Sequence, residues 1–111
     1  MNLTVGIEED NRHYTMKLTG EIDVYTAPEL KEKLLPLTEE SNNTIQIDLE
    51  NTSYLDSTGL GVFISALKSA KENQSYVELI NVRGRVLRLF KVTGLDEIIH
   101  IKAEPQDEEG N

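Results

Sequence analysis

Two different spacings of apolar residues alternate along this chain, and they limit its fold more than any other feature. Five segments alternate apolar with polar residues, which is typical of half-buried strands, around residues 3–7, 14–18, 44–50, 76–80 and 99–101. Asp10-Asn11 is the predicted turn of a hairpin between the first two. Three other segments have apolar residues at helical spacing, over about 26–37, 57–72 and 84–92. The predicted order is β-β-α-β-α-β-α-β.

This order predicts how the strands pair and where the helices lie. Strands joined through helices should be parallel and connected by right-handed crossovers. A parallel strand that is covered on both faces usually forms a continuous apolar run, whereas these strands alternate. We therefore expect an α/β fold with a mixed, mostly parallel β-sheet, helices packed on one face, and the other face largely exposed.

The ends of the helices have recognisable signals. Thr26 and Glu29 have the spacing of a capping box at the start of the first helix. Pro36 is expected to end or kink that helix. Asp56 or Ser57 is expected to cap the second helix.

Charge and composition exclude several classes of protein. The chain has 20 acidic and 11 basic residues, giving a net charge of −9, which argues against binding to nucleic acid or to an anionic membrane. It has no cysteine, so a disulfide framework and a thiol nucleophile are excluded. The longest apolar run, residues 60–67, is too short to span a bilayer. No secretory signal is visible at the N-terminus, so we expect a soluble cytoplasmic protein.

The charge is unevenly distributed between one domain and its tail. Residues 1–102 are predicted to form the domain, and residues 103–111 an acidic, disordered tail with four acids and no base. The stretch 83–91 is the opposite, with four bases and no acid: Arg83, Arg85, Arg88 and Lys91. It can bind an anion, or simply be a solvated helix face.

The search for catalytic and cofactor motifs is mostly negative. The chain has no Gly-x-Ser-x-Gly elbow, no dinucleotide fingerprint and no phosphate-binding loop. His13 and His100 match no metal-binding spacing and are expected on polar strand faces. Asp48 and Glu50 could pair for acid–base chemistry, but a solvated strand face is the simpler interpretation. We predict neither an enzyme nor a bound cofactor or metal.

One segment, residues 54–61 (Tyr-Leu-Asp-Ser-Thr-Gly-Leu-Gly), has no such simple explanation. Gly59 and Gly61 fall in the first helical turns, where each costs about 1 kcal/mol relative to alanine and a cap needs neither. Their missing side chains suggest that another backbone approaches there. A phosphate on Ser57 would add about −1.5 to −2 charges without melting the helix, and would exclude a docked partner. Ser57 is thus a candidate switch, and a plain helix start is the alternative.

Three segments together resemble a known family. Residues 20–28 (Gly-Glu-Ile-Asp-Val-Tyr-Thr-Ala-Pro), the Asp-Ser-Thr-Gly-Leu-Gly motif at 56–61, and residues 88–95 (Arg-Leu-Phe-Lys-Val-Thr-Gly-Leu) are similar to the STAS-domain anti-sigma factor antagonists of Gram-positive bacteria. Among these, the chain looks most like the antagonists of the general stress response (sigma-B type) sigma factor. The resemblance implies the STAS fold, with helices on one face of the sheet.

The resemblance also implies a mechanism called partner switching. The unphosphorylated antagonist, a monomer when free, binds an anti-sigma factor that is also a serine kinase, and the sigma factor is freed. The kinase phosphorylates the motif serine, here Ser57, which releases the antagonist, and a PP2C-type phosphatase reverses this. The residues expected to bind the partner lie in the motif and in the loop after the second strand, which the predicted topology places at the same sheet edge: Asp23, Tyr25, Thr26, Asp56, Thr58, Gly59 and Gly61. Asp23 and Asp56 are expected to face a basic kinase surface.

Other interpretations stay open. Within the family, the chain could be a sporulation-type antagonist, although residues 24–28 favour the stress branch. It could also be a scaffold subunit of a stressosome, although such subunits often carry an extra domain that 111 residues cannot hold. From a different class, it could be a small nucleotide-binding module that uses the helix start at 57–61. The third helix is more basic than the family pattern, with Lys91 where an acid is common.

Overall fold

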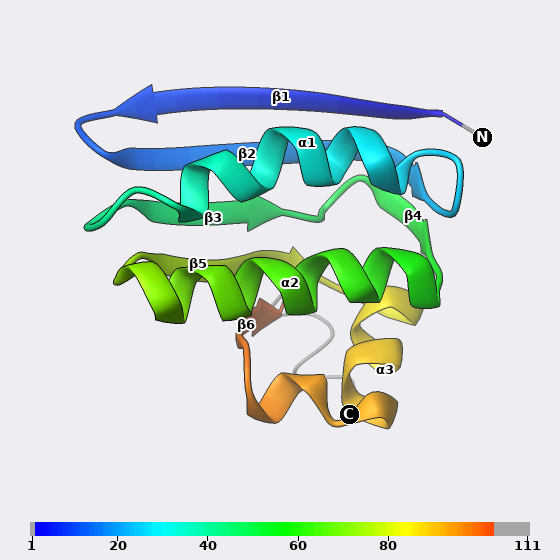
Figure 1. Ribbon diagram of the computed structural model, residues 1–111. Helices are drawn as coiled ribbons and strands as arrows, with labels where there is room; N and C mark the ends of the chain where they lie inside the picture. The colour runs from blue at the N-terminus through cyan, green and yellow to red at the C-terminus, as the bar shows by residue number, and fades with distance from the viewer. Residues whose placement is uncertain (1, 104–111) are drawn as a thin grey trace.

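The computed structural model describes residues 2–103 and contains one mixed β-sheet (Figure 1). The strand order is β1-β2-β3-β5-β6, and β4 pairs with β2 beside this path. β1 is antiparallel to β2, and every other pairing is parallel. The predicted α/β class, with a mostly parallel sheet, is confirmed. The strand bounds are β1 Leu3–Asp10, β2 His13–Ile22, β3 Thr44–Asp48, β4 Thr52–Leu55, β5 Tyr76–Val82 and β6 His100–Ala103.

Strand β4 is an element that the pattern of apolar residues does not predict. The expected strand over 44–50 ends at Asp48, and the chain turns before β4 begins. β2 is ten residues long, so its first half pairs with β3 and its last residues pair with β4. Only Thr52 and Leu55 of β4 are buried, which leaves no alternation to detect. This short strand leads directly into helix α2 and therefore sets the position of the motif.

The hairpin turn lies one residue later than predicted. The register closes with Asp10 opposite His13, which leaves Asn11 and Arg12 as the two turn residues. Both have positive φ, 51° and 66°, as the type I′ turns that suit the twist of a hairpin require. The guanidinium of Arg12 donates to the carbonyl of Ser41 at 2.8 Å, which links this turn to the segment before β3.

The three predicted helices are present close to their expected bounds: α1 Ala27–Thr38, α2 Ser57–Asn73 and α3 Gly84–Thr93, followed by the 3-10 turn η1 Leu95–Glu97. Pro36 lies inside the last turn of α1, and the helix continues to Thr38, so the proline does not end it. Gly94 ends α3 with a φ of 78°. The tail was expected to begin at residue 103, but Ala103 is the last residue of strand β6. The rest of the expected tail, residues 104–111, lies outside the described residues.

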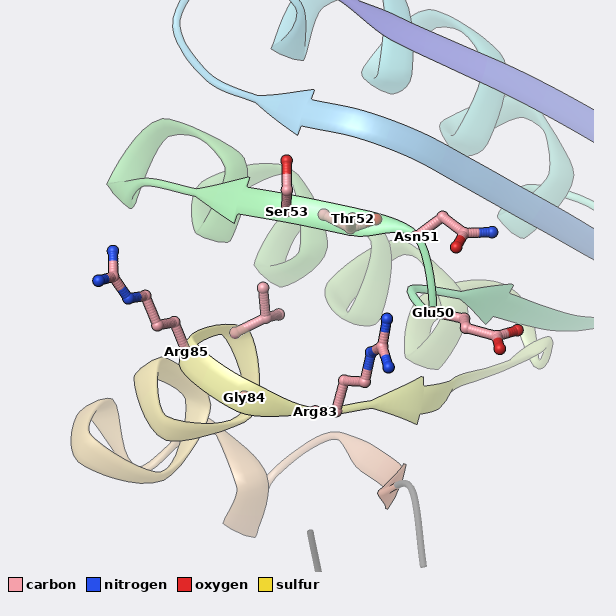
Figure 2. Close-up of a pocket in the computed structure, with 8 residues that line it drawn as sticks. Glu50, Asn51, Thr52, Ser53, Arg83, Gly84 and Arg85 are labelled. Atoms are coloured by element: carbon pink, nitrogen blue, oxygen red, sulfur yellow. The ribbon is translucent and has the colours of Figure 1, made fainter. Parts of the chain in front are cut away.

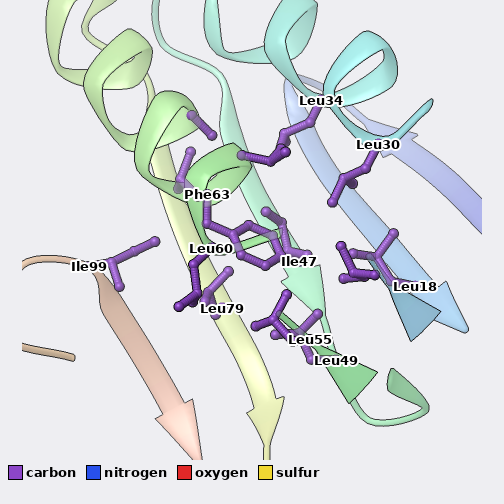
Figure 3. Close-up of a cluster of buried hydrophobic side chains, with 14 of the residues drawn as sticks. Leu18, Leu30, Leu34, Ile47, Leu49, Leu55, Leu60, Phe63, Leu79 and Ile99 are labelled. Carbon is purple, nitrogen blue, oxygen red and sulfur yellow. The ribbon is translucent and has the colours of Figure 1, made fainter. Parts of the chain in front are cut away.

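The apolar faces of all three helices enter one core. α1 and α2 lie side by side against the same face of the sheet (Figure 1). Figure 3 shows Leu60 and Phe63 of α2 pointing at strand residues such as Leu79. Phe90 of α3 joins the same core, with its ring centroid 6.1 Å from that of Phe63. The arrangement with helices on one face is thus the predicted one.

The opposite face of the sheet is polar. The Gln46 side chain on β3 links the two neighbouring strands on this face: it hydrogen-bonds His13 of β2 at 3.1 Å and donates to Glu78 of β5 at 2.9 Å. The ring of His100 lies 5.0 Å from that of Tyr76, so both histidines are polar-face strand residues, as predicted. Burial and the nearby Glu78 carboxylate raise the pKa of Tyr76 above its usual value.

Asp48 and Glu50 do not form the solvated pair that their spacing suggested. Asp48 is the last residue of β3 and is buried, while Glu50 lies beyond the strand and is exposed. The Asp48 carboxylate accepts from the Glu50 amide at 2.9 Å and from the Asn81 side chain at 3.1 Å. Its role is therefore to hold the turn after β3.

Candidate functional site

The motif lies where the carboxyl ends of neighbouring strands meet. β2 ends at Ile22 and β4 at Leu55, and these two residues are paired in the sheet. The Asp56 amide donates to the Ile22 carbonyl at 3.3 Å, which ties the start of α2 to the loop before α1. Sites in sheets of this kind are usually built at this edge. The loop 23–26 and the motif 56–61 are therefore adjacent although 30 residues separate them in sequence.

Ser57 is the first residue of α2 and is exposed. Asp56, not Ser57, caps the helix: its carboxylate accepts from the amides of Thr58 at 3.0 Å and Gly59 at 3.1 Å. Among residues 2–103 the Ser57 hydroxyl makes no hydrogen bond, so it is available for a reaction. Thr58 is also exposed and is the neighbouring hydroxyl.

The two glycines of the motif have different surroundings. A Cβ on Gly59 would lie 2.3 Å from Leu55 Cδ1 and 2.7 Å from Ile22 Cγ2. The close approach that requires this glycine is therefore internal, between α2 and the ends of β4 and β2, and the expectation that it admits a partner is corrected. A Cβ on Gly61 would meet nothing within 4 Å. Of these two glycines, it is therefore Gly61 that leaves an open surface.

That open surface is part of a groove of about 440 Å³ between the first turns of α1 and α2. It is lined by Val24, Ala27, Pro28, Lys31, Thr58, Gly61, Val62 and Ser65. Val24, which lines the groove, and Tyr25, the next residue, expose 57% and 80% of their surface. Val24 was not among the predicted site residues, although an apolar residue in a polar loop is a signal that could have identified it.

Tyr54 is a second exposed apolar residue at this edge that the site prediction missed. It lies on β4, two residues before Asp56, and exposes 50% of its surface. Its β2 neighbour in the sheet is Glu21, which leads into the loop holding Val24 and Tyr25. Val24, Tyr25 and Tyr54 are thus exposed apolar side chains on the two segments that meet at this edge of the sheet.

Asp23 and Thr26 hold the loop rather than extend from it. They expose only 6% and 7% of their surface. The Asp23 carboxylate accepts from the amides of Tyr25 at 2.9 Å and Thr26 at 3.1 Å, and the Thr26 hydroxyl accepts from the Asp23 amide at 2.9 Å. The expected capping box is wrong, because Thr26 makes no side-chain cap bond and Glu29 instead pairs with Lys33 at 3.1 Å.

This geometry corrects the expected charge at the site. Asp23 does not present its carboxylate to a partner, because that group is buried and bonded within the loop. Asp56 is half-buried and occupied by two amides. The same occupancy leaves the amides of Thr58 and Gly59 unable to cradle a phosphate, which removes the basis of the nucleotide-binding interpretation.

A second depression, of about 590 Å³, lies between β4 and the start of α3 at the same edge (Figure 2). Figure 2 shows the Arg83 side chain rising into it, while the Ser53 hydroxyl points away toward β2, where it donates to the Gly20 carbonyl at 3.3 Å. Within residues 2–103 no group of His, Asp and Glu side chains could hold a metal ion. No described helix is long and apolar enough to cross a membrane.

Comparisons with known proteins agree on one family. The STAS domain model matches residues 4–108. An anti-sigma-B factor antagonist of Staphylococcus aureus (strain NCTC 8325 / PS 47) is 42% identical over 101 residues, covering 91% of this chain and 94% of that protein. The crystal structure of an anti-sigma factor antagonist from Mycobacterium paratuberculosis superposes with a TM-score of 0.78 at 26% identity, covering 98% of this chain and 92% of the other.

The fold is also shared with the anti-sigma factor antagonist SpoIIAA, whose structure is known in two forms. The unphosphorylated form gives a TM-score of 0.70 at 17% identity, covering 96% of this chain and 94% of the other. The phosphorylated form, described as a Bacillus cell fate determinant, gives 0.64 at 18% identity, covering 96% and 98%.

Proposed function

The chain belongs to the STAS-domain anti-sigma factor antagonists, and from this membership we propose that it works by partner switching controlled by one residue, Ser57. In its unphosphorylated form it binds an anti-sigma factor that is also a serine kinase, and the sigma factor is released. Phosphorylation of Ser57 ends that binding, and a PP2C-type phosphatase restores it. The protein acts as a regulator rather than as an enzyme, in the cytoplasm, where ATP and the sigma factor are available.

The stress-response branch is the better supported of the two family branches. Identity to the sigma-B type antagonist is 42%, against 17% and 18% to SpoIIAA. This difference supports a sigma-B type partner rather than a sporulation-type one.

The docking surface that we propose is the groove between α1 and α2 together with the apolar residues beside it. Large exposed apolar side chains supply much of the binding energy in protein interfaces, and Tyr25 is exposed by 80%. Gly61 leaves open space in the groove, so a partner side chain or backbone can approach α2 closely there. Ser57 is the first residue of α2 and so lies beside this surface, within reach of the same partner.

The observation that carries the proposal is the arrangement of Asp56 and Ser57. The Asp56 carboxylate accepts the free amides in the first turn of α2, so the Ser57 hydroxyl is not needed as a cap. Ser57 is exposed. In the reaction the serine oxygen bonds to the γ-phosphorus of ATP, the bond from that phosphorus to the departing ADP oxygen breaks, and the serine proton passes to a base of the kinase. The fold need not change for the residue to be modified.

The added phosphate acts on the partner rather than on the helix. It brings about −1.5 to −2 charges beside the Asp56 carboxylate. The amides of Thr58 and Gly59 already donate to Asp56, so the phosphate is left to face outward. A partner closing over it would have to desolvate a dianion, which is costly without a matching cation.

Mapping the modified residue tests this function directly. We expect incubation with the kinase, ATP and Mg²⁺ to place one phosphate on Ser57. Ser57→Ala should stay unphosphorylated and keep binding the kinase, because the docking surface is intact. Ser57→Asp should bind it much more weakly.

The matched control is Thr58→Ala, which removes the neighbouring exposed hydroxyl and should still be phosphorylated. A phosphate found on Thr58 or elsewhere in the wild-type chain would overturn the role of Ser57. Binding to the kinase that survives full phosphorylation would overturn partner switching itself.

A further inference from the structure

The exposed face of α3 carries a cluster of basic side chains, although the protein as a whole is acidic. Arg85, Arg88 and Lys91 are spaced three residues apart, so they follow one side of the helix, and Arg83 stands at its start. All four are exposed, while Val86, Leu87 and Phe90 on the other side are buried. We call these four bases the α3 basic face.

These bases have no acidic partner among residues 2–103. The ion pairs formed there join Lys33 to Glu29 and Lys102 to Glu78, at 3.1 and 3.9 Å. Glu50 lines the same depression as Arg83, yet its carboxylate points away from that guanidinium in Figure 2. The basic face is therefore a surface with an uncompensated charge of four.

The chain continues from a point directly beside this face. Ala103, the last residue of β6, is paired in the sheet with Val82, and the next residue after Val82 is Arg83. The last described residue therefore lies next to the start of α3, and residues 104–111 follow it in the sequence. They contain four acids and no base: Glu104, Asp107, Glu108 and Glu109.

We propose that the occupant of the α3 basic face is the chain's own segment 104–111. The charges match in number, four against four. Eight extended residues reach about 26 Å at about 3.3 Å each. The ten residues of α3 span only about 15 Å, so the acids can reach all four bases.

Covalent attachment strengthens the interaction. Single exposed ion pairs contribute little, but a segment tethered at the edge of its site has an effective concentration in the millimolar range. The occupied face is closed to other anions, including acidic surfaces of other proteins. This inference concerns a surface separate from the motif and does not depend on the proposed function.

A spin label on the full chain tests the proposal. The sequence has no cysteine, so Gly110→Cys gives one labelling site and keeps all four acids. We expect the nitroxide to broaden the backbone amide signals of residues 83–91. The broadening should disappear in about 1 M salt, where the Debye length is about 3 Å, and reappear in about 0.01 M salt.

Two charge variants of the labelled chain make the test specific. Replacing Arg83, Arg85, Arg88 and Lys91 with Gln should abolish the broadening over α3. The matched control replaces four lysines elsewhere with Gln and should retain it: Lys17, Lys33, Lys68 and Lys71. Broadening limited to the neighbours of Ala103, or unchanged by the α3 substitutions, would overturn the proposal.

Discussion

Gly59 and Gly61 are both glycines in the first turns of α2, but a side chain is absent at the two positions for different reasons. At Gly59 a methyl group would meet Leu55 Cδ1 and Ile22 Cγ2 at 2.3 and 2.7 Å. At Gly61 the same methyl group would meet nothing within 4 Å. The first glycine therefore serves the core of this protein, and the second serves the surface that we propose for docking.

Alanine substitution should separate these two roles. We expect Gly59→Ala to lower the free energy of unfolding by about 1–3 kcal/mol, because the core there has no room. Gly61→Ala should raise it by up to about 1 kcal/mol, because alanine is the better helix former. Urea unfolding of both variants measures this.

Binding to the kinase gives the second half of the same comparison. Gly61→Ala should weaken binding although it stabilises the fold, because the added methyl group projects into the groove. A Gly61→Ala variant that binds as tightly as the wild type would show that the partner does not approach α2 at this point.

At the scale of the elements, the connection from β2 to α1 depends on one buried carboxylate. Asp23 accepts from the amides of Tyr25 and Thr26 and so holds Tyr25 outward, next to the motif. The connection from β4 to α2 uses Asp56 in the same way. Two aspartates thus set the two loops that meet at the site.

Replacing Asp23 should therefore act through geometry rather than through charge. Asp23→Ala should lower the free energy of unfolding by about 1 kcal/mol, as the loss of a helix cap does, and weaken binding to the kinase. Asp23→Asn keeps an oxygen that can accept both amides, so it should retain most of the stability and the binding. Thermal unfolding and a binding titration measure these effects. Binding lost equally in both variants would restore a direct electrostatic role for Asp23.

At the scale of the whole molecule, phosphorylation should change the surface and leave the fold intact. The core formed by the three helices and the sheet does not include Ser57, which is exposed. Asp56 continues to cap α2, and the helix dipole favours a negative group at this end.

The amide spectra of the two forms measure this expectation. Shifts should be confined to the residues around 56–61 and the facing loop 23–26, and the unfolding temperature should change little. Shifts spread through β3 and β5, or a large fall in the unfolding temperature, would mean that phosphorylation acts by refolding.

Much of this protein follows from local sequence pattern. Period-two and helical spacings predicted the mixed sheet, the three helices and the one-sided packing, because burial of apolar faces decides all of these. The short strand β4 was not predicted, because only Thr52 and Leu55 of its four residues are buried and they do not alternate with exposed ones. The hairpin turn was misplaced by one residue, because only the register of the pairing shows which residues must adopt positive φ.

The sequence by itself determined the fold class, the family and the candidate switch residue, since each depends on short motifs or apolar spacings and on their order along the chain. Only the tertiary structure decided the roles within the site. It showed that Asp23 is buried and that the groove beside Gly61 is open. It also showed that the side chains of Ile22 and Leu55 leave no room for a Cβ at Gly59. These facts depend on contacts between loops that are 30 residues apart, and a linear pattern carries no information about which atoms fill the space beside a residue.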